Sequence, residues 1–209
     1  MVGEPLSIRA PLVTTPNPAS LMNRLDEPTL GLKASNFVVF QLAWFAAVVS
    51  AAHEQAVYGS FVVLAALAWH LVVAHRAQRE AVLMVSVTLI GFVVEALQVR
   101  LGFVRYAESS ANALWPPVWI VFMWPLLGIT LNVSLRWLRD RPFVAALLGS
   151  VCGPLAFAGG VRLGAAEFVD TIAALASQAL AWAVLLPLMF ALARRFDGMA
   201  STRCEASHA

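Results

Sequence analysis

Six apolar segments of about 20 residues follow one another through most of this 209-residue chain. Crossing the hydrocarbon core of a bilayer takes about 20 predominantly apolar residues of α-helix. Short polar stretches such as HEQA, RAQRE and RDRP separate the segments, and no alternating pattern predicts a β-strand. We therefore predict an all-α integral membrane bundle of six transmembrane helices, over residues 36–52, 57–75, 81–100, 116–137, 142–161 and 170–193.

The composition argues against a soluble globular domain. Hydrophobic residues make up 60% of the chain and charged residues only 12%, whereas soluble domains carry about 25% charged residues. A soluble fold of this size exposes a large part of its surface to water, so it cannot conceal so much apolar area. The net charge of +2 predicts no basic surface for nucleic acid. The expected partner is the lipid bilayer.

The distribution of cations predicts the orientation in the membrane. Loops on the cytoplasmic side carry an excess of Lys and Arg. With a cytoplasmic N-terminus, the outer side holds three cations, Arg100, Arg105 and Arg162. The inner side holds the other eleven: Arg9, Arg24, Lys33, Arg76, Arg79, Arg136, Arg139, Arg141, Arg194, Arg195 and Arg203. We therefore predict that both termini are cytoplasmic (N-in/C-in).

The two ends of the chain differ from the apolar centre. Residues 1–34 contain five of the eleven prolines and no long apolar run, so they are predicted to form a disordered cytoplasmic tail. Both Met1 and Met22 remain candidate start residues. Residues 35–195 form the predicted six-helix transmembrane domain, and the polar residues 196–209 form a second predicted disordered tail.

One polar stripe runs along the third apolar segment. Thr88, Gly91, Glu95 and Gln98 recur at three- and four-residue steps and so share one helical face. A carboxylate inside a bilayer is costly, which favours a binding or ion-pairing role for Glu95. Glu95 lies about five residues from the outer end of its segment, and each residue of an α-helix advances about 1.5 Å along the axis. Its expected partners are Gln98 and one outer arginine, either Arg100, Arg105 or Arg162.

A second polar layer is predicted at the inner ends of the helices. His70 and Asn132 lie at similar depth, and Asn36 and Arg136 reach the same level. About 15 Å along the membrane normal separates His70 from Glu95, so a catalytic His–Glu dyad between them is not expected. We favour a role in interhelical hydrogen bonding for Asn132. For His70 we favour a structural role. The candidate binding residues are Glu95, Gln98, Arg162, His70 and Asn132.

Motifs for chemistry are lacking in the sequence. It contains no H-E-x-x-H, G-x-S-x-G or C-x-x-C pattern, so no catalytic residue, metal ligand or cofactor is predicted. Gly149, Gly153, Ala156 and Gly160 form a small-residue ridge in the fifth segment. Such ridges let helices approach closely, and this one offers a contact surface for a homodimer.

Three segments resemble a known family. NFVVFQLAWFAAV, PPVWIVFMWPLLGITLNVSLRWLRDRP and ALLGSVCGPLAFAGGVRLGA, in this order, are similar to an uncharacterised family of small bacterial inner-membrane proteins known only as a domain of unknown function. The most specific block is P-x-W…W…T-L-x-x-S-L-x-W-L, over Pro117, Trp119, Trp124, Thr130, Leu131, Ser134, Leu135, Trp137 and Leu138. The resemblance implies a multi-pass protein of the bacterial inner membrane. It also hints at lipid chemistry, because relatives are encoded beside genes of fatty-acid modification.

Three functional hypotheses remain open. The first is a membrane protein that binds or transports a small molecule or lipid through its intramembrane polar groups. The second is an accessory or scaffold subunit that partners a lipid-modifying enzyme. The third is an intramembrane enzyme, which ranks last because the two polar layers contain no nucleophile–base pair.

Overall fold

The chain folds into an all-α bundle. The computed structural model describes residues 27–107 and 114–200, so the predicted tail segments 1–26 and 201–209 lie outside these ranges. The helices are α2 (Leu30–Ala52), α3 (Ala56–Val73), α4 (Ala77–Arg100), α5 (Val118–Leu131), α6 (Pro142–Arg162) and α7 (Thr171–Arg195). Within the described residues, five of them are long and apolar enough to cross a membrane.

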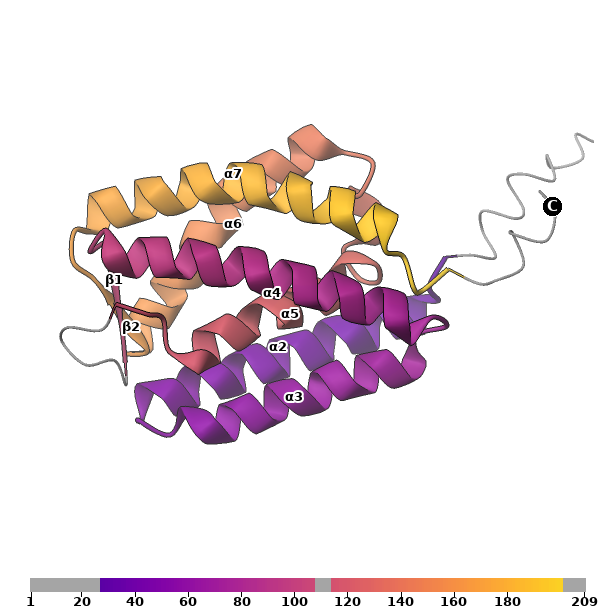
Figure 1. The fold of residues 1–209 in the computed structure, drawn as a ribbon, viewed down its shortest axis with the longest axis horizontal. Coiled ribbons are helices and arrows are strands. Elements are labelled where there is room, and N and C mark those ends of the chain that lie inside the picture. Colours follow the sequence, from indigo (N-terminus) through magenta and orange to yellow (C-terminus); the bar gives the residue numbers. More distant parts are fainter. Residues whose placement is uncertain (1–26, 108–113, 201–209) are drawn as a thin grey trace, which may run out of the picture.

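The helices pack as three antiparallel pairs (Figure 1). The pair α2–α3 lies on one side of the bundle and the pair α6–α7 on the other, with α4 and α5 between them. Large apolar side chains on the outer faces are exposed, for example Leu42, Phe61, Leu89 and Val184. Exposed apolar surface on this scale is typical of helices that face lipid.

The fourth predicted helix is shorter than expected. A single helix over 116–137 was predicted, but α5 has 14 residues and ends at Leu131. Residues 132–135 form turns, and a 3₁₀ helix, η1, follows at Arg136–Leu138. The side chains of Asn132 and Ser134 bond to other helices, and such side chains compete with helical geometry. Nine of the 14 residues in α5 are buried, so this helix forms the centre of the bundle.

A small sheet, which the periodicity did not predict, closes one end of the bundle. Strand β1 (Val104–Tyr106) pairs antiparallel with β2 (Ala166–Phe168). Arg105 lies opposite Glu167 and forms an ion pair with it. Strands of three residues are too short to show an alternating pattern. We call this the sheet end.

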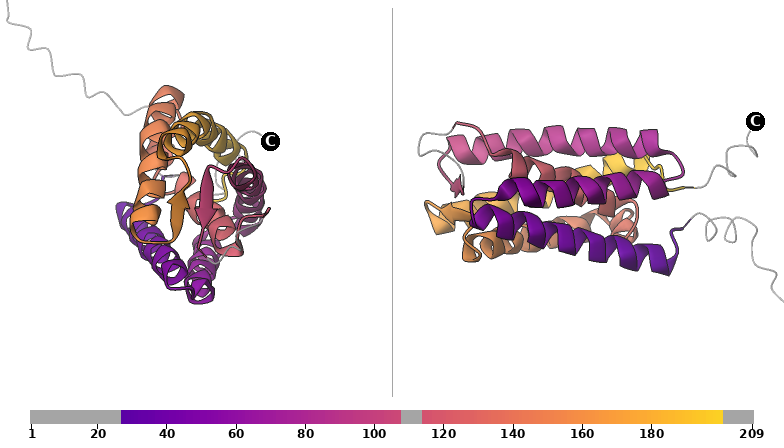
Figure 2. Two further views of the ribbon diagram at one scale, coloured as in Figure 1. Left: turned by 90° about the vertical axis from the view of Figure 1, so that its left-hand side faces the viewer. Right: turned by 90° about the horizontal axis from the view of Figure 1, so that it is seen from below.

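The two described chain ends lie together at the opposite end of the bundle, which we call the terminal end (Figure 2). Helix α2 begins at Leu30, six residues earlier than the predicted segment, with the Thr29 hydroxyl capping it through the N–H of Leu32. Residues 196–200 also pack against the bundle, and Met199 is buried. Part of each predicted tail is therefore structured.

Candidate functional site

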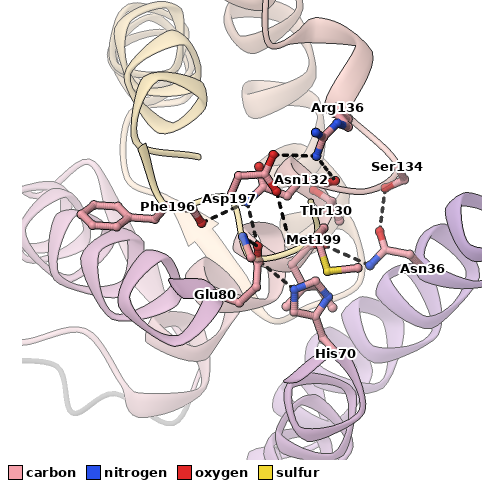
Figure 3. Close-up of polar contacts among 12 residues, drawn as sticks. Asn36, His70, Glu80, Thr130, Asn132, Ser134, Arg136, Phe196, Asp197 and Met199 are labelled. Atoms are coloured by element: carbon pink, nitrogen blue, oxygen red, sulfur yellow. Dashed lines mark hydrogen bonds and ion pairs between the residues drawn. The ribbon is translucent and has the colours of Figure 1, made fainter. Parts of the chain in front are cut away.

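A buried carboxylate organises the polar groups of the terminal end (Figure 3). Glu80 Oε2 lies 2.9 Å from His70 Nε2. Glu80 Oε1 accepts hydrogen bonds from Asn132 Nδ2 at 2.9 Å and from the backbone N–H of Gly198 at 2.8 Å. His70, Glu80 and Asn132 are each 0% exposed. We call these four residues the Glu80 cluster.

The chain path explains why His70 and Glu80 meet. Helix α3 ends at Val73 and α4 begins at Ala77, so the two helices form a tight hairpin. His70 and Glu80 are equally distant in sequence from His75 at this turn. The antiparallel hairpin therefore brings the two side chains to the same level on facing helices.

The segment after α7 completes the cluster. Asp197 Oδ2 forms ion pairs with Arg136 Nη1 at 2.8 Å and Arg139 Nη1 at 2.6 Å. This contact holds Gly198 against Glu80. A Cβ at Gly198 would lie 2.5 Å from the Arg76 carbonyl oxygen, so only glycine fits the position. Ion pairs and hydrogen bonds thus anchor residues 197–200, which belong to the segment predicted to be a disordered tail.

The polar contacts at the terminal end extend beyond the Glu80 cluster to Asn36, Ser134 and Arg136. Asn36 Nδ2 donates to the carbonyl oxygen of Ile129 at 3.0 Å, and the Ser134 hydroxyl donates to Asn36 Oδ1 at 2.8 Å. Arg136 donates to the Asn132 carbonyl oxygen at 3.3 Å. These bonds connect α2, α5 and the residues after α5. Their partners are protein groups, which fits the structural interpretation of Asn132.

Glu95 lies near the sheet end of α4 and is 1% exposed. The Tyr106 hydroxyl donates a hydrogen bond to Glu95 Oε2, and Trp124 Nε1 donates to Oε1 at 3.1 Å. The predicted ion pair with an outer arginine is wrong. Tyr106 on β1 bonds to the carboxylate instead, and Arg100, Arg105 and Arg162 are exposed.

The three outer arginines have other surroundings. The Arg100 guanidinium lies 4.3 Å from the centre of the Trp115 ring, and Arg105 pairs with Glu167 across the sheet. Arg162 is exposed at the end of α6 and makes no ion pair within the described residues. Gln98 is buried, but its Oε1 accepts from the Ser177 hydroxyl on α7 at 3.2 Å. The predicted grouping of Glu95 with Gln98 and Arg162 is therefore not formed.

A cavity of about 300 Å³ adjoins Glu95. Its lining is mostly apolar, and Glu95 is the only acidic residue among the described residues that line it. Residues from α2, α4, α5, α6, α7 and both strands contribute to the wall. The aromatic members of the lining are Phe40, Trp44, Tyr106, Trp119, Trp124, Phe157 and Trp182. We call this space the Glu95 cavity.

Two glycines position two of these tryptophans. Trp124 and Trp182 stack with ring centres 5.2 Å apart and an interplanar angle of 7°. A Cβ at Gly91 would lie 2.0 Å from the Trp124 ring, and a Cβ at Gly153 would lie 2.3 Å from Trp182 Cγ. Gly91 on α4 and Gly153 on α6 therefore leave the space in which the stacked pair fits.

The same contact accounts for half of the predicted small-residue ridge. A Cβ at Gly149 would lie 2.3 Å from the Trp182 carbonyl oxygen, so Gly149 and Gly153 both pack against α7 of the same chain. A dimer through these two glycines would have to displace α7. All four ridge residues, Gly149, Gly153, Ala156 and Gly160, also line the Glu95 cavity.

Two polar groups accompany Glu95 at the cavity wall. Burial raises the pKa of the Tyr106 phenol well above its usual value, and the charge of Glu95 raises it further. Tyr106 therefore stays protonated and acts as a donor. Trp119 contacts the Tyr106 ring edge-to-face, with centres 5.7 Å apart. The buried Trp119 Nε1 has no hydrogen-bond partner among the described residues.

Several of these residues were not predicted as site residues from the sequence. Glu80 and Tyr106 were assigned to polar separators between helices, and Asp197 to a tail. The equal spacing of His70 and Glu80 about the turn was the available signal for the first pair. No local pattern marks Tyr106, because its contact with Glu95 depends on the fold of the sheet end.

Residues 33–188 match the family described as "Protein of unknown function (DUF2878)". The chain belongs to this family. The match runs from α2 into α7 and so includes both the Glu80 cluster, apart from Gly198, and the Glu95 cavity. The expected membership of an uncharacterised family is confirmed. The chain matches no curated protein and no solved structure.

Proposed function

We propose that this membrane protein binds an apolar small molecule or a lipid in the Glu95 cavity. The observation that carries the proposal is a cavity of about 300 Å³ beside a buried carboxylate, between helices long enough to span a bilayer. Pockets for small ligands are typically apolar spaces with a few convergent polar groups. Here Glu95, Tyr106 and the Trp119 N–H are the polar groups.

The position of the cavity supports a ligand that enters from the membrane. The cavity is partly open, and two small residues of α6 that line it, Cys152 and Ala156, are exposed. An opening lined by small residues suits an apolar ligand. Such a ligand would leave the bilayer without crossing water.

We further propose six crossings, with both termini in the cytoplasm of a bacterium and the Glu95 cavity near the periplasmic side of the inner membrane. The cation bias supports this orientation. The two described chain ends lie at the same end, as an even number of crossings requires (Figure 2). A periplasm-active reporter fused after Arg139 should stay silent, whereas one fused after Arg162 should be active. The opposite pattern would overturn the orientation.

Filling the cavity tests the binding function. Gly160 lines the cavity, and a Cβ added there meets no atom within 4 Å. A Gly160→Leu substitution should therefore occupy ligand space without a backbone clash. Gly31 is the matched control, because a Cβ there also meets nothing and the residue lies outside the cavity lining.

The readout is the content of small molecules and lipids that co-purify with each variant, measured by mass spectrometry. Wild type and Gly31→Leu should retain one apolar species at a fixed ratio to protein, and Gly160→Leu should lose it. The same retained content in Gly160→Leu, or no species above the bulk lipid background in wild type, would contradict the proposal.

A further inference from the structure

The geometry points to a lipid-like cation as the ligand of the Glu95 cavity: an apolar chain that carries an ammonium group next to an oxygen acceptor. This inference rests on the proposed function and narrows its ligand class. Three features of the wall support it, namely the Glu95 carboxyl group without a cationic partner, the aromatic rings and the unpaired Trp119 N–H.

The Glu95 carboxyl group is the first feature. Both of its oxygens accept hydrogen bonds, but the donors, Tyr106 and Trp124, are neutral. No cation forms an ion pair with Glu95 within residues 27–107 and 114–200. An isolated carboxylate in an apolar environment is costly unless a positive charge or a proton compensates it. A cationic ligand in the adjoining cavity would supply that charge.

The aromatic wall is the second feature. Trp44, Trp119, Trp182 and Tyr106 line the same space as Glu95. The faces of aromatic rings attract cations, tryptophan most strongly, and the attraction grows when water is excluded. Quaternary ammonium groups are the cations typically held in this way, because their methyl groups also pack against the rings.

The Trp119 N–H is the third feature. Trp119 is 4% exposed, and its Nε1 has no partner among the described residues. An indole nitrogen is only a donor, and a buried donor without an acceptor is unfavourable. An oxygen acceptor on the ligand, such as an ester carbonyl, would satisfy it. A ligand that satisfies both residues therefore carries a cation for Glu95 and an oxygen acceptor for Trp119.

A pair of probes that differ only in charge tests the inference. Hexanoylcholine carries an apolar chain, an ester carbonyl and a quaternary ammonium group. The ester 3,3-dimethylbutyl hexanoate has the same shape with carbon in place of the ammonium nitrogen. Saturable binding of each probe is measured by tryptophan fluorescence on the full chain in phosphatidylglycerol nanodiscs, whose lipid carries no ammonium group, with empty nanodiscs as the reference.

Wild type should bind hexanoylcholine about tenfold or more tightly than the neutral ester. Glu95→Gln should remove this preference and leave binding of the neutral ester unchanged. Glu167→Gln is the matched control, since this exposed carboxylate lies at the same end outside the cavity lining, and it should keep the preference. Thermal unfolding of each variant checks that it is folded.

The outcomes distinguish failure of the cation inference from failure of the proposed ligand binding. Equal binding of both probes to wild type would overturn the cation inference but leave ligand binding in the cavity intact. Binding of neither probe would overturn the inference, and the co-purification test on Gly160→Leu would then decide the function. Trp119→Phe keeps an aromatic ring and removes the N–H, so it should weaken binding of the neutral ester, for which the loss of the indole cation contact plays no part. An unchanged affinity for this ester in that variant would overturn the acceptor part of the inference.

Discussion

Helix α4 carries two buried carboxylates near its opposite ends, and their surroundings differ. Glu80 bonds to His70, Asn132 and the N–H of Gly198, and none of these residues lines the Glu95 cavity. Glu95 bonds to two neutral donors and faces a cavity of about 300 Å³. The bonds of Glu80 hold helices together, whereas Glu95 has space beside it for a ligand.

The partners of the two carboxylates come from different parts of the chain. Those of Glu80 lie on α3, after α5 and after α7, so one side chain joins segments that are far apart in sequence. The partners of Glu95 lie on β1 and α5. Glu80, whose three partners join distant segments, stabilises the fold, whereas Glu95, with two neutral partners and a cavity beside it, is available for binding.

The largest expected effect is on stability, from Glu80→Ala. The substitution removes the acceptor of His70 and of the Gly198 N–H, and leaves Asn132 Nδ2 only the Phe196 carbonyl oxygen at 3.4 Å. Breaking a buried pair of this kind costs about 3–5 kcal/mol of unfolding free energy. Denaturant or thermal unfolding of the purified protein measures the change.

The matched control for this prediction is Glu167→Ala, which removes an exposed carboxylate. It should change the unfolding free energy by no more than about 1 kcal/mol. Equal stability of Glu80→Ala and wild type would remove the structural role from the Glu80 cluster, and with it the distinction between the two carboxylates.

A smaller effect is expected from Gly153→Ala. The new Cβ would lie 2.3 Å from Trp182 Cγ, so the ring must move. Overpacking of this kind costs about 1–3 kcal/mol. The far-UV circular dichroism couplet of the stacked pair Trp124–Trp182 should weaken at the same time. Gly160→Ala is the control and should leave both signals unchanged; a full couplet in Gly153→Ala would contradict the assigned role of Gly153.

The smallest effect is expected from Arg162→Ala. Although Arg162 was a candidate binding residue, it is exposed and outside the cavity lining. Exposed substitutions of this kind change stability by about 0.5 kcal/mol or less. Hexanoylcholine should bind the variant with wild-type affinity, and a clear loss of affinity would bring the outer arginine back into the site.

The apolar segments predicted five of the helices well because length and hydropathy are local properties. The end of α5 was not predictable in the same way, since the helix stops where Asn132 and Ser134 bond to distant residues. The two-stranded sheet was missed because three-residue strands lack a detectable period.

The candidate site was predictable in part. Helical spacing placed Gly91 and Glu95 on one buried face, and depth placed His70 and Asn132 in one layer. Glu80, Tyr106 and Trp119 were missed, because their importance comes from contacts between segments distant in sequence or from burial. The predicted ion pair between Glu95 and an arginine was wrong for a related reason. Depth in the membrane does not show which side chain lies next to the carboxylate, and here it is Tyr106 on β1.

The most direct test of the difference between the two carboxylates is a parallel titration of hexanoylcholine into wild type, Glu80→Gln and Glu95→Gln in nanodiscs, below the unfolding temperature of each variant. Glu80→Gln should bind with wild-type affinity, and Glu95→Gln should bind about tenfold or more weakly. An affinity loss confined to Glu80→Gln, or equal affinities in all three proteins, would contradict the assignment of ligand binding to the Glu95 cavity.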